Sequence, residues 1–409
     1  MITFSDFQTP QPDTITFTVS NATSSFVNAL RRTIITDVQT VSFNVDDYTK
    51  SDLTVIKNTS SVHNEFILHR LGLLPINFKG VPKYNPDTYK FVLNVTNKTS
   101  KSINVTTKDI KVINLETNQE EDNSIFFPPN PITHDNILLI KLKPNIAGKE
   151  GESIHIEGKS SKGTGEDHIR FSPVSCIMFT NKRDPEKVNA ELSNYVKDVE
   201  SSRGQSIDPS ELPTLAKTFD LEYADRYYYT DENGDPNVFN FSIESCGILK
   251  PNAILIEGIV KLINKLKNFI NSLNKSLSNQ DSNVEIREST SIMKAFDITI
   301  ENESHTLGFL LQTFINKLFR EDNIFVGYMN PHPLQKKIML RINVNSNDIN
   351  EVKRVIETTV NQLLNNLKIL RNEVDRVFEP KKKFSVRKSK KAMGNDVMDE
   401  TIEEDLVDI

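Results

Sequence analysis

The sequence predicts an α+β fold of two related units, with a mostly β domain inserted into the first. Three observations predict this. A pattern of strand, polar turn and amphipathic helix occurs near residue 15 and returns near residue 296. Each copy ends on a long amphipathic helix. The stretch 41–169 lacks this pattern and is rich in β-branched residues and turn formers, as a separate β domain would be.

The first copy opens with a strand followed by a helix. Ile15, Phe17 and Val19 alternate with threonines, which is the period-two pattern of a half-buried strand. Residues 21–25 supply side chains that cap helices. Apolar side chains then continue at helical spacing from Phe26 to Ile34.

The second copy repeats this order. Phe296, Ile298 and Ile300 form the alternating strand, and Leu307 begins the helical pattern. Placing Val19 on Ile300 also places Asn21 on Asn302 and Phe26 on Leu307, so the two copies form a divergent internal repeat. The closing helices are read from apolar stripes over 255–277 and 352–374.

A hairpin is expected between the short helix and the long helix of each copy. In the second copy, 324–326 and 338–344 flank a turn containing Pro331 and Pro333. In the first copy, the expected strands are 174–179, 227–229 and 238–243. Each unit is therefore predicted as β-α-β-β-α. The apolar helix stripes favour packing of the two units against each other as a pseudo-symmetric internal dimer.

The expected domain boundaries follow from these patterns. They are 1–40 with 170–278 for the first unit, 41–169 for the insert, 279–291 for a polar linker, 292–378 for the second unit and 379–409 for a disordered tail. The tail carries seven cations within 381–391 and then seven anions within 396–408.

Composition excludes several classes of protein. The chain has 409 residues with 49 Lys+Arg against 55 Asp+Glu, a formal charge of −6, so it is not a bulk electrostatic binder of nucleic acid or membranes. Its two cysteines, Cys176 and Cys246, cannot form a disulfide framework or a four-thiolate zinc site. We expect an intracellular protein without a signal peptide or a membrane span.

No catalytic constellation can be assembled from the sequence. Gly158–Ser160 lacks the preceding glycine and the following helix of a phosphate-binding loop. His63 and His69 lie on different faces of one predicted helix, and Asp231–Asp235 is predicted to be a hairpin turn. We interpret His332 as a turn residue, Cys176 as a buried thiol, and His305 and Thr306 as helix-start residues. No nucleophile, base and orienting group come together.

Several local strings resemble one family. Asn28–Thr33 (NALRRT) and Asn64–Ile76 (NEFILHRLGLLPI) resemble the signature of the third-largest subunit of eukaryotic RNA polymerase II, a relative of the archaeal D subunit and the bacterial α N-terminal domain. Further segments are similar to its insert-to-core return and final strand; they are Gly165–His168, Phe171–Val174, Glu244–Gly247 and Leu249–Pro251.

The second unit is similar to the eleventh subunit of RNA polymerase II and to the archaeal L subunit. The strings that carry this resemblance are His305–Gly308 (HTLG), Val326–Tyr328 (VGY), Pro331–Leu334 (PHPL) and Lys337–Ile338. In cellular polymerases these α-like units are usually two chains that form a heterodimer, whereas here they are fused. The fusion resembles polymerases of nucleocytoplasmic large DNA viruses, which implies a virus factory in the host cytoplasm and the virion as locations.

The resemblance implies a non-catalytic scaffold in transcription, the α-like platform of a DNA-directed RNA polymerase. Implied partners are the second-largest and largest subunits and small tenth- and twelfth-type zinc-binding subunits, with DNA and RNA contacted only through the complex. The expected interface residues are Asn28, Arg31, Arg32, Glu65, His69, Arg70, His305, Thr306, Leu307 and Phe314. Arg31 and Arg32 suit pairing with a partner's carboxylate, and a solvated helix edge is the alternative.

One departure from the family concerns cofactors. Eukaryotic third-largest subunits commonly carry a zinc-binding cysteine cluster in the insert, and some archaeal relatives carry an iron–sulfur cluster there. Residues 41–169 contain no cysteine, so no cofactor is expected. Two other functions stay open. One is a free-standing DNA-binding transcription factor that uses the basic block 381–391, and the other is a hydrolase with an unrecognised site.

Overall fold

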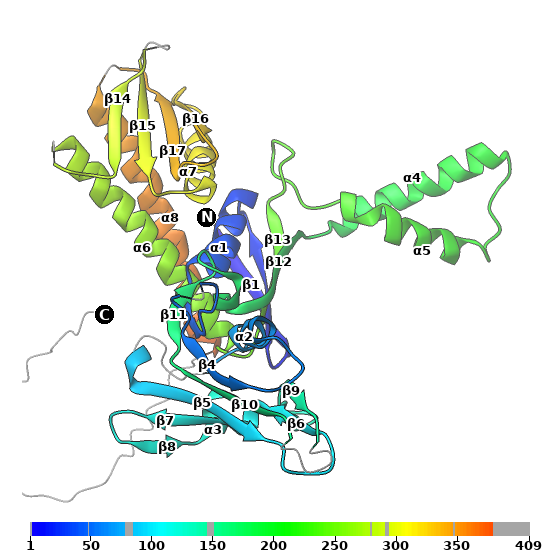
Figure 1. Ribbon diagram of the computed structural model, residues 1–409. Helices are drawn as coiled ribbons and strands as arrows, with labels where there is room; N and C mark the ends of the chain where they lie inside the picture. Colours follow the sequence, from blue (N-terminus) through cyan, green and yellow to red (C-terminus); the bar gives the residue numbers. More distant parts are fainter. Residues whose placement is uncertain are drawn as a thin grey trace, which may run out of the picture.

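The computed structural model describes residues 2–47, 49–77, 85–144, 151–278, 280–290, 294–346 and 348–378. Figure 1 shows three parts: a central unit, a second unit beside it and a separate β domain below. The α+β prediction is confirmed. The expected tail, 379–409, lies outside the described residues. None of the described helices is long and apolar enough to cross a membrane.

The first unit is a four-stranded antiparallel sheet covered by two helices. Its elements are β1 (Thr3–Gln11), β2 (Thr14–Ser20), α1 (Ser24–Asp37), β12 (Val174–Asn181), β13 (Val238–Ser245) and α6 (Pro251–Leu277). The strand order is β1-β2-β13-β12. Thr23 caps α1, because its side chain accepts from the backbone N–H of Phe26.

The second unit repeats this topology. Its elements are β14 (Val284–Glu288), β15 (Ala295–Glu301), α7 (His305–Leu318), β16 (Phe325–Met329), β17 (Lys337–Asn343) and α8 (Ile349–Phe378). The order β14-β15-β17-β16 matches that of the first sheet strand for strand. Asn21 and Asn302, aligned from sequence, both adopt left-handed backbone angles, with φ of 57° and 60°. Asparagine tolerates this conformation, so the same turn leads into both short helices.

The segment 279–291 was expected to be a linker, but residues 284–288 of it form strand β14. This strand pairs with β15 and buries Val284. Likewise β1, which the sequence pattern did not indicate, pairs with β2. Both are edge strands whose side chains are mostly exposed, so they lack an apolar alternation. Each unit is therefore β-β-α-β-β-α.

The insert has its own hydrophobic core. Its elements are β3 (Gln39–Ser42), β4 (Leu53–Asn58), α2 (Asn64–Gly72), β5 (Tyr89–Thr96), β6 (Ile103–Thr106), β7 (Ile110–Asn114), β8 (Gln119–Glu121), α3 (Asn123–Phe126), β9 (Leu138–Leu142), β10 (Ser153–Gly158) and β11 (Ser161–Thr164). A five-stranded sheet, β4-β10-β5-β7-β8, packs around Phe91 and Phe126. The chain leaves the first unit along β3 and returns along β11, and these two strands pair as a short antiparallel stalk.

A helical arm extends from the first unit between β12 and β13. It consists of α4 (Pro185–Arg203) and α5 (Leu212–Glu222) and projects away from the body in Figure 1. Asp184 caps α4, and Gly204 ends it in the left-handed conformation. No helix was predicted for these residues from the sequence. The expected strand 227–229 is reduced to isolated bridges at Tyr228 and Thr230.

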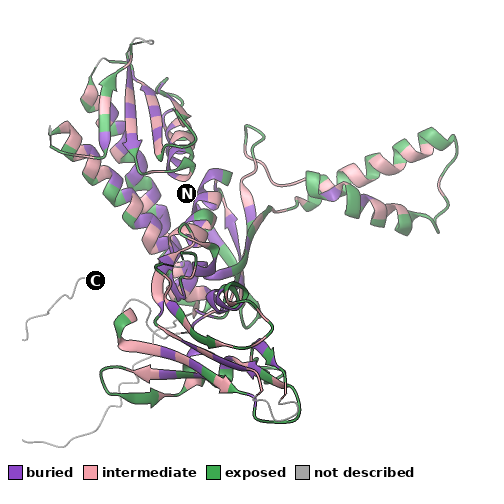
Figure 2. Ribbon diagram, viewed as in Figure 1, coloured by how far each residue is buried: buried purple, intermediate pink, exposed green. Residues whose placement is uncertain are grey.

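The two units share one core, which runs from Ile2 to Val374. The long helices interlock: α6 packs on β2 and β13 of its own unit and on β14 of the other, while α8 packs on β1. Figure 2 shows buried residues, in purple, along α6 and α8 from one sheet toward the other. The expected internal dimer is thus built around the helices α1, α6, α7 and α8.

Candidate subunit-docking surface

Helix α1 divides the arginine pair between two roles. The Asn28 side chain accepts a hydrogen bond from Nε of Arg31 at 3.1 Å, and both residues are half-buried. Burial, and then the charge of Arg32, lower the pKa of the Arg31 guanidinium. Arg32 instead donates from Nε to the Thr306 hydroxyl of the second unit at 2.9 Å. Arg31 is therefore half-buried beside Asn28 on its own helix, whereas the exposed Arg32 bonds across the seam between the units.

Helix α2 presents one exposed face, which we call the α2 face. It consists of Phe66, His69, Arg70 and Leu73, spaced at i, i+3, i+4 and i+7, with Glu65 beside them. Phe66 and Leu73 are 71% and 50% exposed, while Ile67, Leu68 and Leu71 on the other side are buried. Phe66 lies within the Asn64–Ile76 string, but its exposure was not predicted. The seven-residue spacing between Phe66 and Leu73, which places both on one side of a helix, was the sequence feature that could have indicated this face.

The α2 face continues onto strand β9 of the same domain. Arg70 donates from Nη2 to the carbonyl of Leu138 at 2.8 Å, which fixes α2 against β9. Ile137 and Leu138 are themselves exposed. Neighbouring exposed apolar and charged side chains on a helix are typical of protein interaction sites.

The His305–Gly308 string serves both the seam and the packing inside the second unit. His305 hydrogen-bonds the hydroxyl of Tyr328 through Nδ1, and Thr306 accepts from Arg32. Leu307 is buried in the shared core. Gly308 lets α7 lie directly on Tyr328, since a Cβ there would be 2.3 Å from Cε2 of that ring.

Phe314 also lies inside the molecule. It is only 6% exposed, and its ring centroid lies 6.1 Å from that of Phe26 in the first unit. Leu307 and Phe314 therefore serve the internal interface between units, not an outer surface.

A charged cluster across the seam was missed by the sequence analysis. Lys265 of α6 lies 2.8 Å from Asp37 of α1 and 3.9 Å from Glu303 of the second unit. Burial would lower the pKa of Lys265, but the charges of Glu303 and Asp37 outweigh it and raise that pKa. Burial raises the pKa of Glu303. No sequence signal existed, because these residues come from three distant elements.

A second exposed surface lies between the units. A groove of about 980 Å³ is lined by Ser24 of the first unit, the turn 231–236 and α7. By the repeat alignment, Phe309 on α7 occupies the place of Asn28 on α1, and it is 51% exposed. The two units thus present different chemistry at equivalent positions: an amide and a cation on one, and an aromatic ring on the other.

The remaining sequence candidates lie in structural positions. Gly158–Ser160 connects β10 to β11, with Lys159 paired to Asp87 at 2.9 Å. His332 accepts from the backbone of Leu334 within its turn. Cys176, expected to be buried, is exposed on β12. This expectation was wrong because β12 is an edge strand whose outer residues reach solvent.

Metal ligation finds no support in the described part of the chain. There, no three His, Cys, Asp or Glu side chains lie close enough to hold a metal ion. The absence of a cofactor stays a prediction.

Comparisons with known proteins match two segments of the chain, one that spans the start of the first unit and much of the insert, and one that spans most of the second unit. Residues 16–126 and 295–373 each match the family described as the RNA polymerase Rpb3/Rpb11 dimerisation domain. The chain belongs to the α-like subunits of RNA polymerase. In it two dimerisation domains are fused.

Relatives of this α-like subunit occur in eukaryotes and archaea. It is 26% identical over 305 residues to a conjugation stage-specific protein of Tetrahymena thermophila, covering 64% of this chain and 93% of the relative. It is 28% identical over 292 residues to the rpac1 subunit of RNA polymerases I and III of Dictyostelium discoideum, covering 64% and 79%. It is 26% identical over 273 residues to the RNA polymerase subunit Rpo3 of Thermococcus kodakarensis, covering 65% and 95%.

The contact of Gly308 with Tyr328 gives a first prediction. Gly308→Ala should lower the free energy of unfolding by about 1–3 kcal/mol, because the methyl group overpacks the α7–β16 contact. Urea denaturation measures the loss. Gly327→Ala is the matched control, since a Cβ there meets no heavy atom within 4 Å. Equal stability of both variants would contradict the contact.

Proposed function

We propose that this α-like subunit is the non-catalytic assembly platform of a multi-subunit DNA-directed RNA polymerase. The single observation that carries the proposal is the shared core, in which two units of identical topology form one body. Because the apolar faces of the helices are already buried between the two units, this body needs no second α-like chain to cover them. It can therefore offer its remaining faces to other subunits.

The outward faces suggest where the large subunits bind. Arg31 on α1 and the α2 face supply cations, an acid and an exposed phenylalanine, which suit a polar and apolar protein interface with the second-largest subunit. The non-equivalent surface around Phe309 would take a different partner, the largest subunit. The tenth- and twelfth-type subunits would bind beside these faces, and nucleic acid would be contacted only through the complex.

The fusion supports a viral source for this platform. Two units that are usually separate chains in cellular polymerases are joined here in one chain, in which β14 of the second unit follows α6 of the first. We therefore propose that the protein comes from a nucleocytoplasmic large DNA virus. It would be located in the virus factory in the host cytoplasm and in the virion.

Affinity purification of the tagged chain, followed by mass spectrometry, tests the platform role. The expected result is recovery of the largest and second-largest polymerase subunits at near-equal stoichiometry. Recovery without them would contradict the proposal. Salt-sensitive DNA binding by the purified chain, lost on truncation after Phe378, would instead favour the DNA-binding factor.

A further inference from the structure

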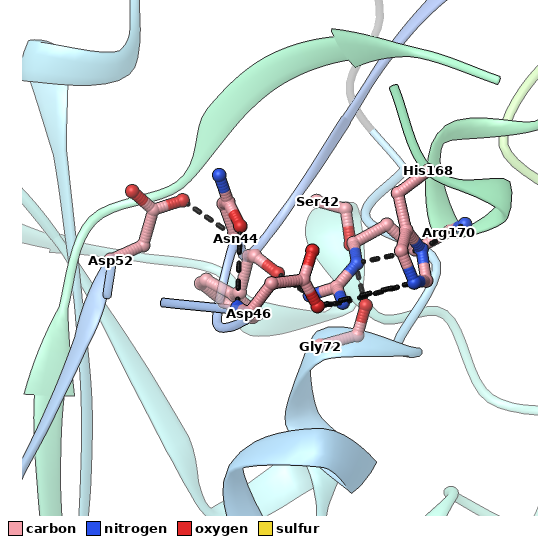
Figure 3. A network of polar contacts seen from close by, with 8 residues as sticks. Ser42, Asn44, Asp46, Asp52, Gly72, His168 and Arg170 are labelled. Carbon is pink, nitrogen blue, oxygen red and sulfur yellow. Dashed lines mark hydrogen bonds and ion pairs between the residues drawn. The ribbon is translucent and has the colours of Figure 1, made fainter. Parts of the chain in front are cut away.

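Residue Arg170 lies at the junction between the first unit and the insert, and no sequence signal assigned it a role. It follows β11 in a short turn where the chain returns from the insert. Its side chain is only 1% exposed. Figure 3 shows it lying among Asp46, His168 and the C-terminal end of α2 at Gly72. Burying a guanidinium costs free energy unless its N–H donors find partners. The partners of Arg170 therefore indicate which segments it holds together.

Each partner comes from a different segment of the junction. Nη2 pairs with the carboxylate of Asp46, which lies in the loop after β3. Nη1 donates to the carbonyl of Phe43 at 2.8 Å. Nε donates to Nδ1 of His168 at 3.0 Å, within the return segment. The side chain thus joins the outgoing and returning chains.

The same guanidinium supports the C-terminus of α2. A Cβ at Gly72 would lie 2.7 Å from Nη1 of Arg170 and 2.6 Å from Cγ2 of Val45, so the helix end rests directly on this cluster. Ser42 at the end of β3 donates to the Gly72 carbonyl at 2.9 Å. A cation near the carbonyl end of a helix is also favoured by the helix dipole.

The stalk makes such a support necessary. Residues 39–42 and 161–164 form a two-stranded ribbon, and a two-stranded ribbon alone is marginally stable and twists readily. Without a further brace, the insert could change its angle to α1. Arg170 holds the insert at the C-terminal end of α2, where its side chain lies against Gly72.

We propose that Arg170, with Asp46 and Gly72, is a positioning cluster that fixes the α2 face relative to Arg31 on α1. This inference rests on the proposed function, because the two faces are taken to bind one partner together. A partner that contacts both faces binds tightly only when their relative orientation is set before binding. Arg170 itself touches no partner and acts through α2.

The test combines variants of the positioning cluster with variants of the two docking faces. The positioning variants are Asp46→Asn, which removes the charge of a half-exposed carboxylate, and Gly72→Ala, which displaces the helix end without changing charge. Each is made in the wild-type chain, in Glu65→Ala/His69→Ala on α2, and in Arg31→Ala on α1. The readout is affinity for the co-expressed second-largest subunit of the same source.

The expected result is selective coupling. Each positioning variant should weaken binding about fivefold in the wild-type background, but less than about twofold where either the α2 side chains or Arg31 are already truncated. An equal loss in all three backgrounds would show a general folding defect and overturn the inference. No loss in any background would overturn it as well.

Failure of the proposed function gives a separate result. If Glu65→Ala/His69→Ala and Arg31→Ala leave the affinity unchanged, the docking surface is wrong, and the positioning inference falls with it. If they weaken binding while Asp46→Asn and Gly72→Ala do not, only the positioning inference fails.

Discussion

Replacing Phe26 with alanine is expected to lower the free energy of unfolding by about 3–5 kcal/mol, the usual cost of removing a buried phenylalanine. Phe26 is 1% exposed and packs on Phe314 across the seam. Because the core is continuous, the loss should appear in one transition that involves both units. Calorimetry and urea denaturation of the full chain measure it.

The insert should respond differently to this change. Its core is separate, so its unfolding transition should stay within about 0.5 kcal/mol of the wild type, as distant sites usually do. Phe309→Ala is the matched control, because this ring on α7 is 51% exposed and should cost little. Independent unfolding of the two units would refute the shared core.

Replacing Arg31 with alanine is expected to weaken binding to the second-largest subunit by at least about 30-fold, or about 2 kcal/mol, the lower end for truncating a desolvated interfacial charge. An arginine carries five N–H donors, and the bond to Asn28 uses one of them. The isolated chain should stay folded, because Arg31 lies outside the hydrophobic core. Co-purification and a binding titration measure the loss.

Two other arginine variants sharpen this result. Arg371→Ala on α8 removes a charge that is 49% exposed and should leave binding unchanged. Arg32→Ala breaks the hydrogen bond to Thr306, so it should lower stability by about 0.5–1.5 kcal/mol while affecting binding far less than Arg31→Ala. Full assembly of the Arg31→Ala variant would contradict the docking face.

The sequence predicted those elements whose apolar residues follow a clear period. Alternation gave β2 and β15, and helical spacing gave α1, α6, α7 and α8, because burial on one face imposes that period. The repeat alignment even matched the left-handed turns at Asn21 and Asn302. Edge strands β1 and β14 escaped prediction, since strands that bury few side chains show no alternation.

The candidate site was predictable only in part. The motifs located α1, α2 and the start of α7, but they could not separate outward residues from inward ones. Arg31 and Arg32 are adjacent in sequence, yet one bonds to Asn28 within its own helix and the other bonds across the seam. That division depends on the place of Thr306, which is 274 residues away from Arg32.

The sequence by itself determined two repeated α+β units, an inserted β domain and the family of both units. These follow from periodicity and local motifs, which are encoded in neighbouring residues. Only the tertiary structure decided that each long helix also packs on the sheet of the other unit, that Phe66 faces solvent, and that Arg170 lies buried at the junction with the insert. Those features arise from contacts between residues far apart in the chain, where burial and charge pairing depend on packing that no local pattern records.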